Sequence, residues 1–324
     1  MRNKLRLSLC TFAAMSLAAA PGLWAQTAPF PSKTIRLISG VTPGSASDTI
    51  ARILTEKLQA SLGQAVIVEN RLGVGGLIGA ASVAKSDPDG HTISIYTSAF
   101  TVAPLLSRGP LDPKDLAPVA MLGSVPTVLI TSPAKGYKNV ADLVAAARAS
   151  PGMLIATTAG IGSSTHMNLE RFRLAAGITF TNVPMKGASE ALTEVLTGRA
   201  DLYFAPVFSV GAHVREGKLL ALAMGSPRRS SLLPDVPTTV EAGYPDSDYH
   251  FWIGALLPAR TPRDIVQRLN REMNAAVNSP DVREKMLKLG VDPLTLSVAD
   301  FETLVRDEFE ANARLIKAAG IKAE

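Results

Sequence analysis

Short apolar segments alternate with longer amphipathic ones along most of this chain. Between residues 34 and 98 the pattern predicts a strand, a helix, a strand, a helix and a strand. The first helix is the clearest of these, because Ile50, Leu54 and Leu58 recur at helical spacing. Strands and helices that alternate in this way indicate an α/β fold with a mostly parallel sheet covered by helices on both faces. The predicted segments are 34–39, 45–62, 65–69, 75–86 and 92–97.

A second unit of the same kind follows residues 104–123, an irregular stretch rich in Pro and Gly. Its predicted strands and helices alternate again, from residue 127 to residue 224. After a loop, residues 252–257 predict a strand, and three helices follow that begin near Thr261, Ser279 and Ser297. The last helix has one apolar side, so we expect it to pack on the first unit.

The connection between the two units carries no Gly/Ser-rich or Pro-rich tether. Two lobes joined by ordered strands, with a hinge where the chain crosses and a cleft between the lobes, explain why a tether is absent. We expect the crossings near Gly123 and Met224. The predicted boundaries are 26–123 with 225–324 for the first lobe and 124–224 for the second lobe.

The N-terminal 25 residues have the layout of a signal peptide. Arg2, Lys4 and Arg6 precede an apolar run at residues 7–20, and small residues follow a Pro-Gly break. The run is too short to cross a membrane. We therefore expect an exported, soluble mature protein that begins near Gln26.

Composition narrows the classes of function. The 324 residues are 47% hydrophobic and 19% charged, which is typical of a globular protein. Removal of the three positive charges of the signal peptide lowers the formal net charge from +5 to +2, and only 5% of the residues are aromatic, so a nucleic-acid partner is not expected. The single cysteine, Cys10, lies in the signal peptide, which leaves the mature chain without a disulfide or a thiolate.

A loop with little side-chain bulk joins the first predicted strand to the first helix. Ser45 with Asp48 three residues later fits a capping box, which places the helix start at Ser45. A helix start leaves free backbone N–H groups with a partial positive charge, so a carboxylate can bind there without Arg or Lys. An ordinary capped turn is the alternative interpretation. The candidate ligand-binding residues are Thr42, Pro43, Gly44, Ser45, Ala46 and Ser47.

The second lobe repeats this construction between a strand and a helix. Two such loops, one from each lobe, can face each other across a cleft and bind one carboxylate from both sides. Thr97, Ser98 and Ala99 form a third candidate wall, because they lie at the end of a parallel strand. Phe204 belongs either to the core or to the cleft, and we include it as a candidate. The candidates in the second loop are Ala159, Gly160, Ile161, Gly162, Ser163, Ser164 and Thr165.

Other motifs do not support a cofactor, a metal or a catalytic centre. The glycines between Gly73 and Gly79 are spaced Gly-x-Gly-x-x-x-Gly, one residue off the dinucleotide fingerprint, and tight helix packing explains them. The four histidines have no metal-ligand spacing. Ser163 and Ser164 lack the Gly-x-Ser-x-Gly turn of a hydrolase nucleophile. We therefore expect no cofactor, no metal and no catalytic residue.

The order and spacing of several motifs resemble the periplasmic solute receptors of tripartite tricarboxylate transporters, often called Bug receptors. The resemblance covers nearly all of the mature chain, residues 30–321. It is carried by Pro43-Gly44 with Asp48 and Ala51-Arg52, Val68-Glu69-Asn70-Arg71, Gly75-Gly76 with Ile78-Gly79, Pro88-Asp89-Gly90-His91-Thr92, Ala159-Gly160-Ile161-Gly162-Ser163 with His166, Lys186-Gly187, Gly198 with Asp201, Pro234-Asp235-Val236-Pro237-Thr238, and Pro258 with Thr261-Pro262.

The resemblance implies a two-lobed, type II (Venus-flytrap) receptor in the periplasm. Such a receptor closes on a small organic carboxylate and delivers it to the permease subunits of a tripartite tricarboxylate-type transporter. In this family the two loops hold the carboxylate through backbone amides, hydroxyls and water, which by position points to residues 42–47 and 161–165. Four residues depart from the family pattern: Val41, Ser45, His91 and Met185. All but His91 are expected at the cleft, so the ligand can be a mono- or dicarboxylate and aliphatic or aromatic.

Two alternative functions remain. A regulatory receptor that reports the ligand to a membrane sensor, such as a sensor kinase, requires the same cleft. An exported hydrolase or transferase on this architecture requires a nucleophile, a base or a metal, which the sequence does not reveal. We expect a monomer that is not an enzyme.

Overall fold

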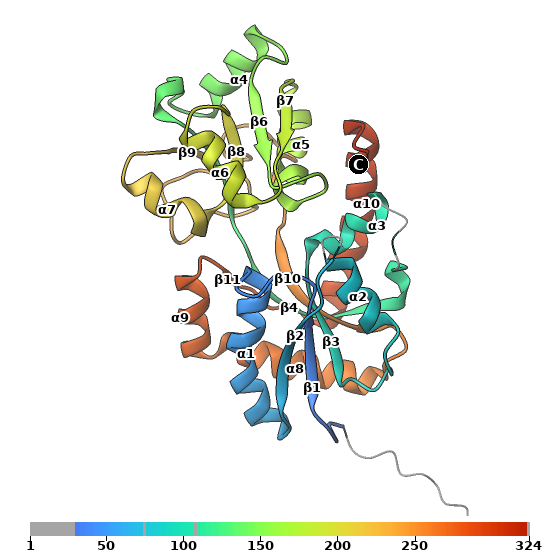
Figure 1. The fold of residues 1–324 in the computed structure, drawn as a ribbon. Helices are drawn as coiled ribbons and strands as arrows, with labels where there is room; N and C mark the ends of the chain where they lie inside the picture. The colour runs from blue at the N-terminus through green and yellow to red at the C-terminus, as the bar shows by residue number, and fades with distance from the viewer. Residues whose placement is uncertain (1–29, 74–75, 107–108, 110, 323–324) are drawn as a thin grey trace, which may run out of the picture.

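The computed structural model describes residues 30–73, 76–106, 109 and 111–322, and they form two lobes (Figure 1). The predicted signal peptide lies outside the described residues. The first lobe contains β1 (Ile35–Ser39), α1 (Ala46–Leu62), β2 (Val66–Asn70), α2 (Leu77–Ala84), β3 (Thr92–Thr97), α3 (Ala103–Leu106), β4 (Leu116–Ser124), β10 (Trp252–Pro258), α8 (Arg263–Asn278), α9 (Pro280–Lys288), β11 (Asp292–Pro293) and α10 (Val298–Ala319). The second lobe contains β5 (Thr127–Thr131), α4 (Val140–Ala149), β6 (Ile155–Thr158), α5 (Ser164–Ala176), β7 (Thr181–Pro184), α6 (Ala188–Leu196), β8 (Leu202–Pro206), α7 (Val207–Arg215) and β9 (Leu220–Met224).

Each lobe is built on a mixed sheet rather than the mostly parallel sheet predicted from the sequence. The strand order is β11-β4-β10-β3-β1-β2 in the first lobe and β7-β6-β8-β5-β9 in the second. The parallel pairs are β1 with β2 and β3, and β6 with β7 and β8. β10 is antiparallel to β3 and β4, and β5 is antiparallel to β8 and β9. The reason is the hinge: β5 and β10 enter their lobes from it, so they run opposite to strands that end there.

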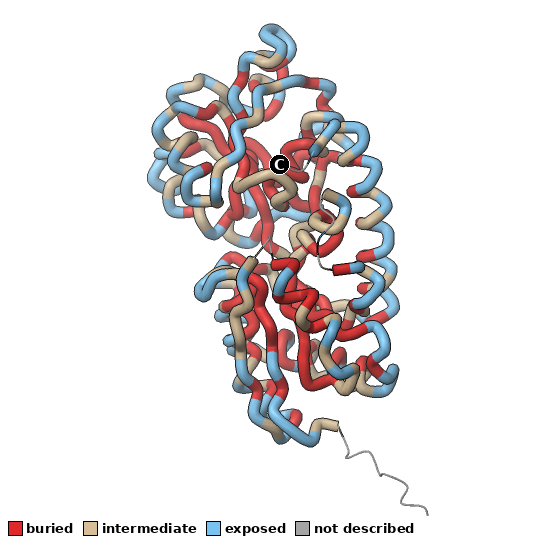
Figure 2. Tube along the Cα trace, turned by 45° about the vertical axis from the view of Figure 1, so that its right-hand side comes forward, coloured by how far each residue is buried: buried red, intermediate tan, exposed pale blue. Residues whose placement is uncertain are grey.

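Helices cover both faces of each sheet, as predicted. In the first lobe α1 and α8 contribute Leu54 and Leu269 to the core on one face, and α2 and α10 contribute Leu77 and Phe301 to the core on the other face. In the second lobe α4 and α5 cover one face and α6 and α7 the other. Figure 2 shows that the buried residues concentrate in the middle of each lobe. Each lobe therefore has its own apolar core.

The stretch at residues 104–123, predicted to be irregular, contains most of β4, a nine-residue strand. β4 pairs with β10 along its length, but β11 reaches only its last two residues, Gly123 and Ser124. At Pro118 one side of β4 is thus a sheet edge. Proline has no N–H to donate, and on this side no neighbouring strand requires one. The Pro residues that suggested a loop are compatible with a strand for this reason.

The second crossing of the chain lies later than predicted. Residues 225–249 stay with the second lobe, where the Gly225 N–H donates to the Thr127 carbonyl oxygen at 2.8 Å and the Tyr244 ring packs 5.5 Å from the Phe172 ring. The chain returns at Phe251, whose carbonyl oxygen accepts from the Val125 N–H at 2.7 Å. The boundary near Met224 was therefore wrong, because a loop without hydrophobic periodicity does not reveal which core it covers.

The last helix packs on both lobes, whereas the sequence predicted contact with the first lobe alone. Near its start Phe301 packs against Trp252 of β10, with ring centroids 5.2 Å apart. Near its end Leu315 belongs to one apolar cluster with Met167 of α5 and Tyr249. Figure 1 shows α10 running upward beside α3 toward the second lobe. Among the described helices, α10 included, none is long and apolar enough to span a membrane.

Candidate functional site

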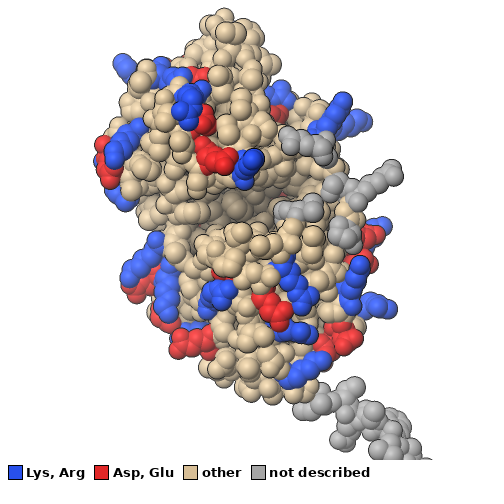
Figure 3. Space-filling model, in the orientation of Figure 1, with Lys and Arg blue, Asp and Glu red and all other residues tan. Residues whose placement is uncertain are grey.

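A cavity of about 680 Å³ lies between the two lobes. Its size is within the range of roughly 300 to 1,000 Å³ that is typical of small-molecule sites. Figure 3 shows the hollow between the lobes, and its visible walls consist largely of uncharged residues. The lining residues are Val41, Ser45, Ala46, Ser47, Leu77, Thr97, Ala99, Ala103, Leu106 and Phe251 from the first lobe side, and Ala159, Ile161, Gly162, Ser163, Ser164, Thr165, Ala188, Pro206 and Phe208 from the second.

The cavity wall is built mainly from the starts of helices. Ala46, Leu77, Ser164 and Ala188 are the first residues of α1, α2, α5 and α6, and all four line the cavity. They meet there because the parallel strands of both lobes end at the cleft, and a helix begins after each strand. Helix N-termini carry a partial positive charge, so the cavity favours an anion although none of its lining residues is charged.

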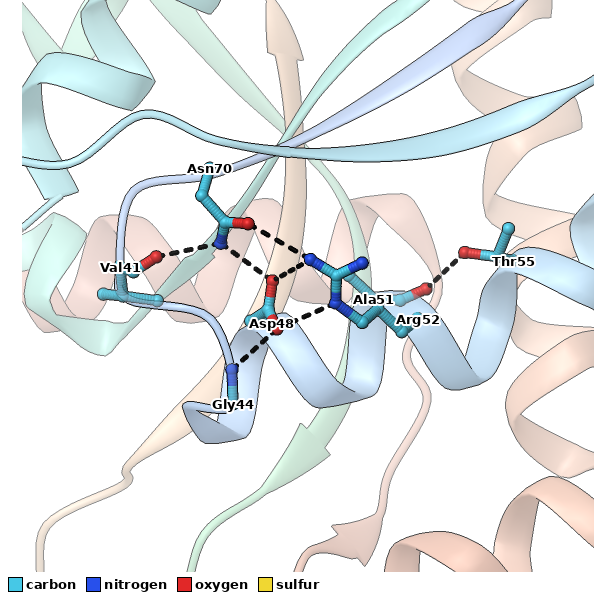
Figure 4. A network of polar contacts seen from close by, with 7 residues as sticks. All are labelled: Val41, Gly44, Asp48, Ala51, Arg52, Thr55 and Asn70. Atoms are coloured by element: carbon cyan, nitrogen blue, oxygen red, sulfur yellow. Dashed lines mark hydrogen bonds and ion pairs between the residues drawn. The ribbon is translucent and has the colours of Figure 1, made fainter.

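A buried carboxylate fixes the loop before α1 (Figure 4). Asp48 accepts hydrogen bonds from the Gly44 N–H at 2.9 Å, from Arg52 Nε at 3.0 Å and from Asn70 Nδ2 at 2.8 Å. The Asn70 amide also donates to the Val41 carbonyl oxygen at 3.0 Å. Burial by itself raises the pKa of Asp48, but the hydrogen bonds from Arg52, Gly44 and Asn70 outweigh it and lower the pKa below its ordinary value. The carboxylate is therefore ionised, and Arg52 compensates its charge.

Neither half of the predicted capping box forms. Asp48 reaches back to Gly44, one residue before the predicted partner, and Ser45 makes no side-chain cap. The Ser45 hydroxyl oxygen is buried without a hydrogen-bond partner in the described part of the chain. Within the same described residues, no protein acceptor takes the N–H groups of Ala46 and Ser47. The start of α1 thus presents unsatisfied donors to the cavity.

The loop before α5 is more fully hydrogen-bonded than the sequence suggested. Ser163 caps the helix by accepting from the His166 N–H at 3.2 Å, and the Gly162 N–H donates to His166 Nδ1 at 3.1 Å. Burial, assisted by Arg173, lowers the pKa of His166 to about 4, so the ring is neutral near pH 7 and Nδ1 can accept. The Gly162 N–H is consequently not free for a ligand. Among the donors of this loop, the N–H groups of Ser164 and Thr165 have no protein acceptor within the described residues.

A chain of hydroxyl groups connects the lobes behind the cavity. Ser98 Oγ lies 3.2 Å from Ser164 Oγ of the second lobe, and the Tyr249 hydroxyl donates to Ser98 Oγ at 3.3 Å. Ser98 is fully buried, whereas Ser164 lines the cavity. The contact therefore joins the two lobes at the cavity wall.

Replacing Ser98 by alanine is expected to weaken ligand binding by roughly two- to tenfold, because one interlobe hydrogen bond contributes about 0.5–1.5 kcal/mol to the closed form. The measurement is titration calorimetry with the carboxylate identified by the screen described under Proposed function. Ser94→Ala is the matched control, since Ser94 is buried on β3, the strand that leads into Ser98. Equal affinity of Ser98→Ala and wild type would show that the bond does not contribute to closure.

Most, but not all, of the residues predicted from the sequence line the cavity. Thr42, Pro43 and Gly44 are exposed and lie outside the lining, because the loop directs only its last residues inward. Gly160 also lies outside the lining, and Ser98 lies behind Ser164. Those that line it are Ser45, Ala46, Ser47, Thr97, Ala99, Ala159, Ile161, Gly162, Ser163, Ser164 and Thr165.

Phe204 is a core residue rather than a lining residue. It is fully buried on β8, and its ring packs 5.6 Å from Phe172 of α5. Side chains alternate along a strand, and Phe204 points to the face that α5 covers, whereas the cavity lies beyond the strand end. Met185 likewise packs on the core beneath α6 and does not line the cavity. Val41 and Ser45, the other two departures expected at the cleft, do line it.

Several lining residues were missed in the sequence. Ala188 and Pro206 had a usable signal, since Pro206 ends β8 as Thr97 ends β3, and Ala188 begins the helix after β7. Leu106 and Phe251 have no local signal, because only the packing of the lobes brings them to the cavity. The missed residues are Leu77, Ala103, Leu106, Ala188, Pro206, Phe208 and Phe251.

Comparison with known proteins identifies the family. The family model described as the tripartite tricarboxylate transporter family receptor matches residues 50–321. The chain belongs to this family. It is 36% identical over 299 residues to protein BugT of Bordetella pertussis, covering 90% of this chain and 91% of the relative.

Solved structures of receptors in this family have the same fold. Rpa4515 of R. palustris, solved with adipate, is 30% identical, and the match has a TM-score of 0.78 and covers 91% of this chain and all of that one. MatC of Rhodopseudomonas palustris, with bound malate, is 28% identical, with a TM-score of 0.74 over 89% of this chain and all of that one. The two-lobed architecture predicted from the sequence is confirmed, and members of the family are periplasmic solute-binding receptors.

Proposed function

We propose that this protein is a periplasmic receptor that captures a small organic carboxylate between its lobes and delivers it to a tripartite tricarboxylate-type permease. One observation carries the proposal: α1 and α5 begin on opposite walls of one cavity, and the start of α1 has unsatisfied donors. A carboxylate placed there accepts from both lobes. The adipate and malate bound to the related receptors are consistent with a ligand of this class.

Ligand capture proceeds by closure of the hinge. Only a ligand that contacts both lobes favours the closed form over the open form. A ligand with equal affinity for both forms does not change the equilibrium between them. Hydroxyls and N–H groups supply those contacts here, without a formal cation. Such contacts suit reversible capture, which a delivery protein requires.

An enzymatic function is disfavoured by the geometry of His166, the histidine that bonds to the lining residue Gly162. His166 Nδ1 accepts from the Gly162 N–H, so it is not available to take a proton from Ser163, whose Oγ lies 3.0 Å from Thr165 Oγ1. Among the described residues no three His, Cys, Asp or Glu side chains form a metal site. A sensory role, in which the closed form contacts a membrane sensor, uses the same cavity and remains the second candidate.

The proposal is tested by thermal-shift screening of the mature chain, residues 26–324, against mono-, di- and tricarboxylates. A ligand that binds only the native state raises the melting temperature, by an amount that grows with concentration above Kd. We expect at least one carboxylate to do so and to be recovered chemically unaltered. Absence of any shift contradicts the proposal, and conversion of the ligand indicates an enzyme. Growth of a deletion strain on that ligand separates transport from sensing.

A further inference from the structure

The cavity is chemically divided between a hydrogen-bonding part and an apolar part. Hydroxyl-bearing side chains are supplied by α1, by α5 and by the residue that ends β3. They are Ser45, Ser47, Thr97, Ser163, Ser164 and Thr165. The unsatisfied donors at the start of α1 belong to this same part. This part of the cavity therefore has the donors to bind a single carboxylate.

The remaining helix starts present apolar side chains to the cavity. Leu77 begins α2, Ala188 begins α6, and Pro206 and Phe208 flank the first residue of α7. None of these side chains can donate a hydrogen bond. The start of α6 also carries Glu190 in its first turn, and this carboxylate opposes a second anion at that helix.

Apolar side chains also stand where the lobes approach each other. A Cβ atom at Gly162 would lie 2.5 Å from Leu106 Cδ1 of the first lobe, and one at Gly290 would lie 2.6 Å from Phe208 Cβ of the second. Both Leu106 and Phe208 line the cavity, and Phe208 is 47% exposed. A large aromatic side chain left open at a cavity wall is a surface that the body of a ligand can cover.

The charged side chains closest to the lining are already engaged. Asp48 is paired with Arg52 at 3.0 Å, and Glu170 with Arg173 at 2.6 Å. Among the described residues, the cation nearest to the lining along the chain is Lys186, which is exposed, lies two residues before Ala188 and is not part of the lining. Among the described residues, a second carboxylate in the apolar part would therefore lose its water without gaining a cationic partner or a side-chain donor.

We propose that the ligand is a monocarboxylate with an apolar body, aliphatic or aromatic, rather than a dicarboxylate. The inference rests on the proposed carboxylate-binding function and specifies its substrate class. The carboxylate binds at the starts of α1 and α5, and the body lies against Leu77, Leu106 and Phe208. In this respect the protein differs from its relatives solved with adipate and malate.

The decisive measurement compares ligands of matched length on the mature chain by titration calorimetry. Each methylene buried against the apolar wall tightens binding by up to about fourfold, so hexanoate is expected to bind on the order of tenfold more tightly than butyrate. Adipate, which is hexanoate with a second carboxylate, is expected to bind at least about tenfold more weakly than hexanoate. Benzoate is expected to exceed terephthalate in the same way.

The outcomes separate this inference from the proposed function. Adipate binding as tightly as hexanoate, or more tightly, overturns the monocarboxylate inference while leaving the receptor function intact. Absence of binding by every mono- and dicarboxylate overturns both. A loss of adipate binding in Lys186→Met would then identify the cation that the second carboxylate uses, which also contradicts the inference.

A substitution in the apolar wall provides an independent test. Phe208→Arg is expected to reverse the preference, weakening hexanoate and strengthening adipate by about tenfold each, because it supplies the missing cation. Phe208→Leu is the matched control, which keeps the wall apolar and is expected to retain the preference for hexanoate. Circular dichroism checks that both variants fold. Unchanged affinities for both ligands in Phe208→Arg would show that the ligand body does not contact this wall.

Discussion

Replacing Ala46 by aspartate is expected to weaken carboxylate binding by at least about 100-fold without lowering the melting temperature. Ala46 is the first residue of α1 and lines the cavity, so the new charge stands beside the carboxylate. Two like charges about 4 Å apart repel by about 4 kcal/mol at an effective dielectric constant near 20. An acid in the first turn of a helix is favourable by about 0.3–1 kcal/mol, which preserves the fold.

The control for this prediction is Ala46→Asn, which has nearly the same size and no charge. We expect it to retain most of the affinity in calorimetry, while the aspartate variant shows no heat of binding. Equal loss in both variants would indicate a steric effect instead of an electrostatic one. Gly162 is a poorer position for the charge, because it has a φ of +73° and a Cβ atom there would lie 2.5 Å from Leu106.

The second large effect is expected from Glu308→Gln and concerns stability. Glu308 is buried on α10, and its carboxylate accepts from Trp252 Nε1 at 2.8 Å and from the Thr101 hydroxyl at 3.3 Å. Burial raises the pKa of Glu308 from 4.5 to about 7, although these hydrogen bonds oppose the rise. Between these two values the native state binds more protons than the unfolded state. The favourable contribution of protonated Glu308 to the free energy of unfolding is therefore fully present below pH 4.5 and is lost as the pH rises through 7.

Glutamine keeps an acceptor oxygen but never ionises, so the variant is expected to match wild type near pH 5 and to exceed it above pH 7. The expected gain in the free energy of unfolding is at most about 3 kcal/mol, since each unit of pKa shift corresponds to about 1.4 kcal/mol. Urea unfolding from pH 5 to 9 measures the difference, with Glu310→Gln on the exposed side of the same helix as control. His166 acts oppositely between pH 6.5 and 4, so only the difference between variant and wild type is informative. A constant difference across the range would contradict the prediction.

The parts of the site that the sequence revealed are those determined by neighbouring residues. The small, hydroxyl-rich loops before α1 and α5 were recognisable because strand ends, turn residues and helix starts are local features. Even there, Asp48 bonded to Gly44 rather than completing the capping box, since Arg52 and Asn70 fix its position from outside the loop. Local patterns thus located the loops without giving their hydrogen bonds.

The parts that the sequence did not reveal depend on how distant segments pack. Phe204 and Phe208 are four residues apart, yet the former packs in the core and the latter lines the cavity, because β8 ends between them. Pro118 made β4 look like a loop, because proline suits a strand only at a sheet edge. Whether a strand position is at an edge depends on the neighbouring strands, which the sequence does not show. Residues 225–249 were assigned to the wrong lobe since their contacts, not their pattern, hold them to the second sheet.

The helix α10 has a mechanical consequence for the receptor. It is fixed at one end by the packing of Phe301 on Trp252 and reaches the other lobe through Leu315. Any rotation that opens the cleft between the lobes must separate Leu315 from Met167 or bend α10. The helix therefore limits how far the cleft opens without ligand. The ligand-free receptor therefore has a small range of interlobe rotation, and a bound carboxylate has to stabilise only a small closing motion.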